Sequence, residues 1–164
     1  VESPQVSEPT SVVVETSEPY VEPVVEPTPI YYDCPLDKET QDYIRVLCEE
    51  NGLPMELVLG VIETESNFQS DIVSGTGDYG LMQINYCNHE WLSEKYGITN
   101  FLDPYQNILC GVSILGQHYR KYEDANKALM AYNMGATGAS RLWEQDIYTT
   151  YYTEKVKECA SKYE

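Results

Sequence analysis

Basic residues are scarce in this sequence. Its 164 residues include 27 Asp and Glu but only 10 Lys and Arg, which gives a formal net charge of -17 at pH 7. Nucleic-acid binding needs clustered Lys and Arg to contact phosphates, and docking on an anionic membrane needs the same residues. Long apolar runs are also missing, since none approaches the ~20 residues that span a bilayer. The sequence therefore argues against nucleic-acid binding, docking on membranes and membrane insertion of this chain.

Histidine is almost as scarce, with only His89 and His118 present. No Cys-x-x-Cys or His-x-x-x-His spacing occurs, and zinc sites depend on such clusters. We therefore expect neither a metal nor another cofactor.

Cysteine occurs in an odd number, so at least one thiol is unpaired within the chain. In an exported protein four of them would form two disulfides, and a bridge between Cys34 and Cys159 would join the two ends of the domain. Alternatively, all five are thiols that pack as small apolar side chains. Both interpretations stay open here. The five are Cys34, Cys48, Cys87, Cys110 and Cys159.

The composition changes near residue 30. Residues 1–30 hold six of the nine prolines, six glutamates and no Lys, Arg or Gly. Proline removes backbone N–H donors and the unpaired negative charges repel one another, so helices and sheets are disfavoured. We predict a disordered, acidic, Pro-rich tail over 1–33, an extended spacer with a reach on the order of 90 Å. One alternative is a short strand that pairs with a partner through the valines of the tail, which are Val12, Val13, Val14, Val24 and Val25. The other is a disordered remnant of a longer chain.

Residues 34–164 show helical periodicity and little strand alternation, so we predict one mainly α domain. Helix-capping residues and prolines divide it into segments. The expected helices run from Asp37 to Asn51, from Pro54 to about Asn67, onward from Asp103, onward from Asp124, and from about Tyr148 to Lys162.

Two carboxyl groups near the end of the second expected helix differ in their surroundings. The residues three, four and seven positions before Glu65 are all apolar: Ile62, Val61 and Val58. Glu65 therefore continues the core-facing stripe, whereas Glu63 belongs to a more polar face. Apolar surroundings and the negative end of the helix dipole raise the pKa of a carboxyl, which suits Glu65 to general-acid catalysis. A Glu hydrogen-bonded beneath the following loop is the structural alternative.

A polar, glycine-rich loop follows over 74–80 and leads to two amide side chains, Gln83 and Asn85. Amides can bind the hydroxyl and acetamido groups of sugars. The 15 tyrosines exceed what a core of this size needs, and their rings suit the apolar faces of sugars. We therefore expect a glycan-binding groove over the end of the helix that carries Glu65. For any single tyrosine, packing in the core with its hydroxyl at the surface is the alternative.

Several short motifs occur in a recognisable order. Glu-Ser-Asn-Phe at 65–68, Gly-Leu-Met-Gln at 80–83 and Ala-Tyr-Asn-Met-Gly at 131–135 resemble the three signature motifs of the soluble lytic transglycosylases, which cleave bacterial peptidoglycan. The segments at 102–111 and 149–152 resemble two further family motifs. The resemblance covers about residues 36–160 and implies a lysozyme-like α domain with a glycan groove.

The resemblance also implies a mechanism. Glu65 would be the single acid/base: it would protonate the glycosidic oxygen between N-acetylmuramic acid and N-acetylglucosamine, then accept the proton of the muramoyl C6 hydroxyl. A 1,6-anhydro end forms without a second carboxylate, whereas ordinary glycosidases use a pair. Tyr132 would lie beside Glu65 and help to position the reaction. The substrate-binding residues implied are Ser66, Tyr79, Met82, Gln83, Asn133 and Tyr152.

The chain departs from the family pattern at two places. Ile84 and Asn85 stand where many members have Pro shortly after the Gly-Leu-Met-Gln motif, and Tyr148 stands where Glu is frequent. The second departure affects one groove contact rather than the chemistry.

Two other functions fit the same residues. A goose-type lysozyme would hydrolyse the bond with a water molecule held by Asp71 or Asp78 of the loop, although loop capping also explains both residues. A non-catalytic peptidoglycan-binding module on a stalk would not need Glu65. In each case we expect peptidoglycan strands as the partner and a monomer at the cell envelope or outside the cell. The start at Val1 is compatible with a removed signal peptide or anchor.

Overall fold

A computed structural model describes residues 19–24 and 27–164. The chain divides into two units, Val1–Ile30 and Tyr31–Glu164. In the first unit, residues 19–24 and 27–30 are exposed and form no helix or strand, as their prolines predict. Of the valines in the strand alternative, Val24 lies in no strand, and Val12, Val13, Val14 and Val25 lie outside the described residues.

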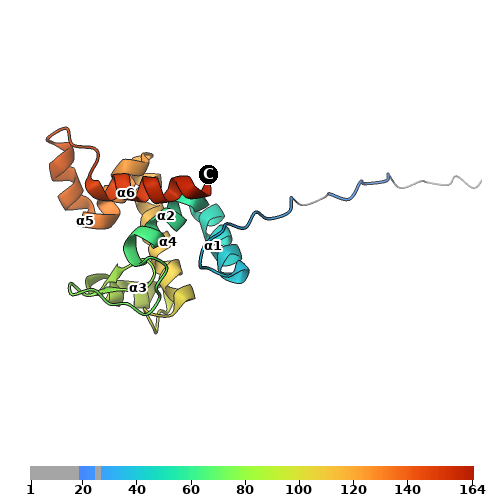
Figure 1. The fold of residues 1–164 in the computed structure, drawn as a ribbon, viewed down its shortest axis with the longest axis horizontal. Helices are drawn as coiled ribbons and strands as arrows, with labels where there is room; N and C mark the ends of the chain where they lie inside the picture. Colours follow the sequence, from blue (N-terminus) through green and yellow to red (C-terminus); the bar gives the residue numbers. More distant parts are fainter. Residues whose placement is uncertain (1–18, 25–26) are drawn as a thin grey trace, which may run out of the picture. The chain divides into compact units, whose positions relative to one another are not determined.

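The second unit is mainly α, as predicted (Figure 1). No helix in the described part of the chain is long and apolar enough to cross a bilayer. Its elements are α1 (Lys38–Asn51), α2 (Met55–Ser66), β1 (Asp78–Tyr79), β2 (Ile84–Asn85), η1 (Tyr86–Asn88), α3 (His89–Tyr96), α4 (Pro104–Tyr122), α5 (Ala125–Trp143), α6 (Tyr151–Ala160) and η2 (Ser161–Tyr163).

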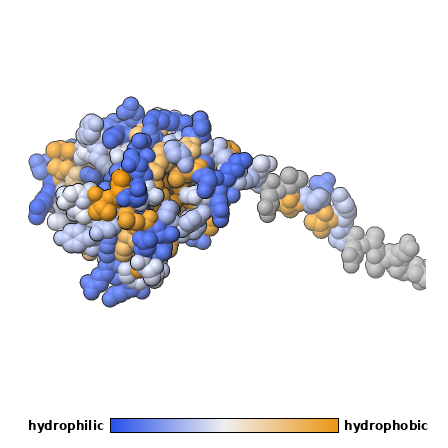
Figure 2. Space-filling view, turned by 60° about the horizontal axis from the view of Figure 1, so that its bottom comes forward, coloured by the Kyte–Doolittle hydropathy of each residue, from blue (hydrophilic) through white to orange (hydrophobic). Residues whose placement is uncertain are grey.

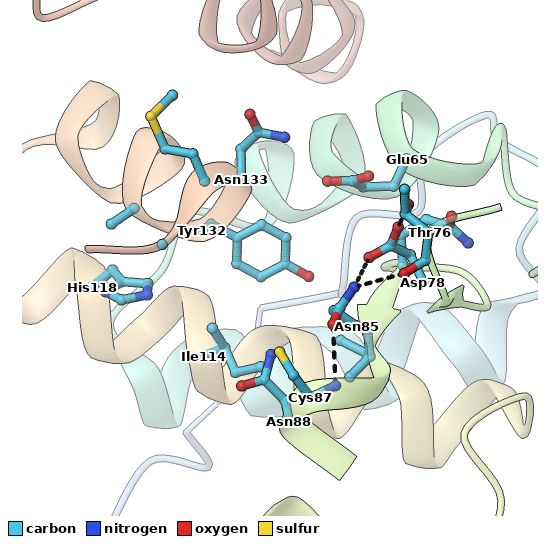
Figure 3. A pocket seen from close by; sticks show the side chains of 15 residues that line it. Glu65, Thr76, Asp78, Asn85, Cys87, Asn88, Ile114, His118, Tyr132 and Asn133 are labelled. Carbon is cyan, nitrogen blue, oxygen red and sulfur yellow. Dashed lines mark hydrogen bonds between the residues drawn. The ribbon is translucent and has the colours of Figure 1, made fainter. Parts of the chain in front are cut away.

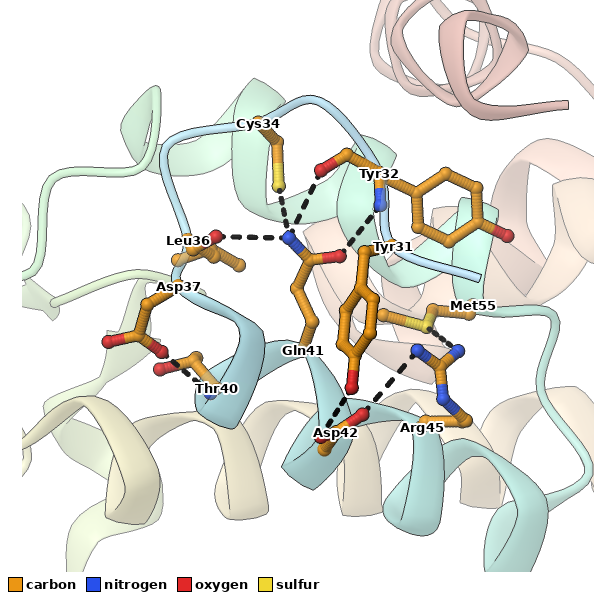
Figure 4. A network of polar contacts seen from close by, with 10 residues as sticks. All are labelled: Tyr31, Tyr32, Cys34, Leu36, Asp37, Thr40, Gln41, Asp42, Arg45 and Met55. Carbon is orange, nitrogen blue, oxygen red and sulfur yellow. Dashed lines mark hydrogen bonds and ion pairs between the residues drawn. The ribbon is translucent and has the colours of Figure 1, made fainter. Parts of the chain in front are cut away.

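The packed unit begins at Tyr31, three residues before the boundary at 33 and 34 that the composition predicts. Gln41, a buried side chain of α1, holds this entry segment (Figure 4). Its amide nitrogen donates to the carbonyl oxygens of Tyr32, at 3.1 Å, and of Leu36, at 3.0 Å, and its oxygen accepts from the Tyr32 N–H at 2.8 Å. Contacts that reach across nine residues determine the boundary, and a change of composition does not reveal them.

The predicted capping residues mark most helix ends. Asp37 accepts a hydrogen bond from the Thr40 N–H at the start of α1, and Asp124 caps α5 in the same way. The last helix begins at Tyr151 and not at Tyr148, because Thr150 forms a capping box there. The short helix α3 and the β1–β2 hairpin were not among the predicted elements.

Helix α2 lies in the middle of this unit and packs closely against α6 (Figure 1). Gly60 permits the approach, since a Cβ atom at that position would lie 2.6 Å from the Val156 carbonyl oxygen. The interior is apolar, whereas the face in Figure 2 is mostly hydrophilic with a few apolar patches. The close contact fixes the middle of α2 against the second half of α6.

The two-residue strands β1 and β2 pair antiparallel around the turn at 80–83. Asn107 of α4, fully buried, holds this turn. Its Oδ1 accepts from the Met82 N–H at 2.8 Å, and its Nδ2 donates to the carbonyl oxygens of Tyr79 and Phe101, each at 2.7 Å. One buried amide thus attaches the hairpin to the helical body.

We expect Asn107→Leu to lower the free energy of unfolding by about 3 kcal/mol or more, because three backbone groups lose their partner. Urea denaturation measures this. The exposed Asn100→Leu serves as control, with an expected change below about 1 kcal/mol. Equal effects of the two substitutions would show that Asn107 does not hold the turn.

Candidate active site

A pocket of about 650 Å³ lies between the end of α2 with the hairpin on one side and helices α4 and α5 on the other (Figure 3). Its lining is largely polar, with several amide side chains. The lining residues are Glu65, Thr76, Asp78, Gln83, Ile84, Asn85, Cys87, Asn88, Ile114, His118, Ala131, Tyr132, Asn133, Met134 and Gly135.

Glu65 stands in the last turn of α2, half-buried at one end of this pocket. The apolar stripe before it is fully buried, as predicted. Burial raises the pKa of Glu65 to about 7, and the charge of Asp78 acts in the same direction. Tyr152 donates a hydrogen bond of 2.6 Å to Glu65 Oε1, which, like the charge of Lys155, opposes the rise. Glu65 is therefore close to half protonated at neutral pH.

Glu63, two residues earlier, has a different environment. It forms an ion pair with Lys162 and accepts a hydrogen bond from the Tyr163 hydroxyl at 2.8 Å. Burial raises the pKa of Glu63, but the bonds from Lys162 and Tyr163 outweigh it and hold the pKa below its usual value. The predicted difference between the two carboxyls is confirmed.

Asp78 of β1 lines the same pocket as Glu65 (Figure 3). Burial raises the pKa of Asp78, but hydrogen bonds from Ser74, Thr76 and Asn85 bring it below the usual value. The pocket therefore holds one carboxyl that keeps its proton to about pH 7 and one that is ionised. Asp71, the other loop carboxylate considered, is exposed and does not line this pocket.

Tyr132 projects into the pocket from α5, with its hydroxyl toward the side where Glu65 and Asp78 lie (Figure 3). Its hydroxyl donates to the Met82 carbonyl oxygen at 2.7 Å. Burial, with the charge of Glu65 next, raises the pKa of Tyr132 well above its usual value. Tyr132 is thus a neutral wall of the pocket that also connects α5 to the 80–83 turn.

The structure places the other sequence-predicted site residues in three ways. Gln83 and Asn133 line the pocket. Tyr152 does not line it but bonds to Glu65. The hydroxyl of Ser66 donates to the Ile62 carbonyl within α2, and Ser66 lines not this pocket but a smaller hollow that Glu65 also borders.

Two predicted residues act from behind the pocket. Met82 is fully buried and packs against Gly111 of α4. Tyr79 packs its ring edge-on against His89, with ring centroids 4.7 Å apart. Both shape the turn rather than line the pocket.

Sequence reasoning missed the pocket residues of α4 and η1. Ile114 and His118 are one helical turn apart and lie on the same face of α4, a spacing that is visible in the sequence. Burial lowers the pKa of His118, as does the charge of Lys121. The glycine at position 135 was a further signal in the sequence. In the structure its φ of 79° interrupts α5 beside the pocket. Only the fold shows which helix faces meet there.

All five cysteines are free thiols in this structure. Within residues 19–24 and 27–164, no group of three His, Cys, Asp or Glu could hold a metal ion.

We expect one equivalent of N-ethylmaleimide to modify Cys87 selectively, since it is the exposed thiol. Cys48, Cys110 and Cys159 are buried, and burial raises the pKa of both Cys48 and Cys110 to about 12. Because Cys87 lines the pocket, the adduct should block access of a polymeric ligand. Intact-mass analysis and peptide mapping check this, with Cys87→Ser as the unlabelled control. Labelling of a buried thiol first would contradict it.

A protein-family model described as the transglycosylase SLT domain matches residues 42–153. This chain belongs to that family. The SLT domain is 39% identical over 89 residues to the transglycosylase of Enterobacteria phage PRD1, covering 54% of this chain and 32% of the relative. It is 30% identical over 124 residues to the membrane-bound lytic murein transglycosylase C of Haemophilus influenzae, covering 66% of this chain and 35% of the relative. The chain thus spans about a third of these relatives' length.

Solved structures agree on the fold. The 70 kDa soluble lytic transglycosylase of Escherichia coli has a TM-score of 0.65 at 20% identity, with 74% of this chain and 23% of that chain covered. A complex of the 70 kDa soluble lytic transglycosylase with bulgecin A gives 0.67 at 21% identity, with 79% and 24% covered. The SLT domain therefore has the lysozyme-like fold that the motifs predict.

Proposed function

We propose that the SLT domain is an enzyme that cleaves the β-1,4 bond between N-acetylmuramic acid and N-acetylglucosamine in peptidoglycan and leaves a 1,6-anhydro end. The observation that carries this proposal is Glu65, a half-buried carboxyl with a pKa of about 7 at the end of a polar pocket. Relatives named lytic murein transglycosylases support it, and their description as membrane-bound favours action in the cell envelope.

Glu65 would act twice in one cycle. Its proton goes to the glycosidic oxygen as the C1–O4 bond breaks, and its carboxylate then accepts the proton of the muramoyl C6 hydroxyl as the C1–O6 bond forms. Water is not consumed. A pKa near 7 suits both steps, and the Tyr152 hydroxyl stabilises the carboxylate between them.

Substrate binding would rely on neutral groups. Gln83, Asn88 and Asn133 can bond to sugar hydroxyl and acetamido groups, and the Tyr132 ring and Ile114 offer apolar surface. Since the chain is strongly acidic, long-range attraction to an anionic cell wall would not bring the substrate to the pocket.

Asp78 favours a second candidate, hydrolysis. Its ionised carboxylate lines the same pocket as Glu65 and could hold a water molecule against C1. Hydrogen bonds from Ser74, Thr76 and Asn85 already occupy this carboxylate, which is why we place hydrolysis second.

Mass spectrometry of digested peptidoglycan distinguishes the two reactions. The anhydro product is lighter by one water than the hydrolysis product. We expect anhydro ends from the wild type and from Asp78→Asn. Reducing muramic ends alone, lost in Asp78→Asn, would identify the hydrolase instead.

A further inference from the structure

The polar side chains of the main pocket fall into two groups. On the side formed by α2, the hairpin and η1, every amide and carboxyl side chain already takes part in a hydrogen bond within the protein. On the opposite side, the Tyr132 hydroxyl is bonded to the Met82 carbonyl oxygen. Asn133 and His118 differ, because neither side chain takes part in a hydrogen bond or ion pair among residues 19–24 and 27–164. These two lining groups are available to a ligand.

His118 lies at the end of the pocket away from Glu65, and the Tyr132 ring stands between the two in Figure 3. The imidazole is half-buried and lies nearly parallel to the Tyr122 ring, with centroids 6.1 Å apart and planes 16° apart. Tyr122 in turn packs edge-on against Trp143, with centroids 4.9 Å apart. This row of rings holds the imidazole in place at the wall of the pocket.

The imidazole can both donate and accept a hydrogen bond. Neither ring nitrogen of His118 is among the buried, unpartnered atoms of the described residues, so the nitrogens remain accessible to solvent. Burial lowers the pKa of His118 from its usual 6.5, and the charge of Lys121 acts in the same direction. The ring is therefore neutral at pH 7, with one N–H donor and one acceptor nitrogen. Such a pair, open to a pocket and unused by the protein, can bind a neutral polar group.

The surroundings of His118 favour an acetamido group among the neutral groups of a sugar. Ile114, one helical turn earlier on α4, and Met134 of α5 add apolar surface to the pocket. The two carboxyls of the lining, Glu65 and Asp78, belong to the other side (Figure 3). An acetamido carbonyl accepts from an imidazole N–H, and its methyl group suits an apolar wall, whereas a hydroxyl has no methyl group to bury.

We propose that His118 is a specificity-determining residue, which bonds to the acetamido group of a sugar at the end of the pocket away from Glu65. The inference rests on the proposed function, because it requires a glycan strand in this pocket. His118 lies outside the segments that resemble the family motifs, so the motifs alone do not include this contact.

The test measures binding to Glu65→Gln, in which cleavage is blocked. The probes are tetra-N-acetylchitotetraose and cellotetraose, two uncharged β-1,4 tetrasaccharides that carry an acetamido group or a hydroxyl group at C2. NMR titration gives both dissociation constants, and their ratio is the acetamido preference. We expect the Glu65→Gln, His118→Phe double variant to lower this preference about fivefold, because Phe keeps the stack on Tyr122 but forms no hydrogen bond.

The matched control is Gln117→Ala in the same background. Gln117 is the exposed neighbour of His118 and does not line the pocket, so the preference should not change. A preference that His118→Phe leaves within about twofold, including an equal loss on both sugars, would show that His118 only supports the pocket wall. Absence of a nuclear Overhauser contact between an acetamido methyl group and Ile114 would also overturn the inference.

These binding measurements are independent of the proposed function. If the wild type cleaves no peptidoglycan strand, the proposed function fails. The acetamido preference needs no cleavage, so its change in His118→Phe still decides the role of His118.

Discussion

Glu65→Gln is expected to lower the rate of peptidoglycan cleavage by about a thousandfold or more. Gln matches Glu in size and still accepts the Tyr152 hydrogen bond, but it has no proton to give to the leaving oxygen and no carboxylate to accept one. Loss of general acid–base catalysis costs about 10²- to 10⁴-fold, and here one group would perform both transfers. Turbidity clearing of purified peptidoglycan, with mass analysis of the products, measures the effect.

The same substitution should stabilise the protein. The pKa of Glu65 is about 7 in the folded chain against 4.5 for an ordinary Glu, so the folded state resists ionisation. This shift costs no free energy of unfolding at pH values below the unfolded-state pKa of 4.5. The cost grows as pH rises and is complete above pH 7. Glu65→Gln should therefore raise the free energy of unfolding at pH 8 by on the order of 3 kcal/mol, with no gain near pH 4. An inactive yet more stable variant excludes misfolding as the cause.

Glu63→Gln is the matched control on the same helix. It loses the ion pair with Lys162 but should retain cleavage of glycan strands stripped of peptide, because Glu63 lines the smaller hollow beside Glu65 and not the main pocket. If Glu65→Gln clears peptidoglycan as fast as the wild type, Glu65 is not the acid. If neither the wild type nor Glu65→Gln clears peptidoglycan but both bind its strands, the domain is a peptidoglycan-binding module.

The environment of Glu65 was predictable because it is largely local. Three apolar residues within two turns of Glu65 determine its face of α2, and the helix ends there. The capping residues Asp37 and Asp124 are local in the same sense, since each bonds to an N–H three residues later. Interactions between residues within two helical turns of one another are visible in a sequence.

Contacts between distant segments were not predictable in the same way. The Tyr152 bond to Glu65 spans 87 residues, and the Asn107 bond to the Met82 N–H spans 25. The resemblance implied that Met82 and Ser66 bind substrate. The fold buries Met82 in the core, whereas Ser66 bonds to its own helix and lines a hollow that Glu65 also borders. Motif residues near Glu65 thus include one, Met82, that packs in the core.

The pH dependence of kcat/KM is the second large effect we expect. In the proposed mechanism Glu65 must carry its proton when the bond breaks, and in the free protein this group has a pKa of about 7. The protonated fraction is nearly complete at pH 6 and falls tenfold per unit well above the pKa. Between pH 6 and pH 9, kcat/KM should therefore fall by about a hundredfold. Initial rates on soluble glycan strands over this range provide the profile.

Two variants should move this profile in opposite directions. Tyr152→Phe removes a hydrogen bond to the carboxylate, which raises the pKa of Glu65 and shifts the fall in rate to higher pH. Asp78→Asn removes a nearby negative charge, which lowers that pKa and shifts the fall to lower pH. Glu63→Gln removes a carboxyl that is paired with Lys162, and it should leave the pH profile unshifted. A flat profile, or shifts of the same sign in Tyr152→Phe and Asp78→Asn, would show that the rate does not follow the protonation of Glu65.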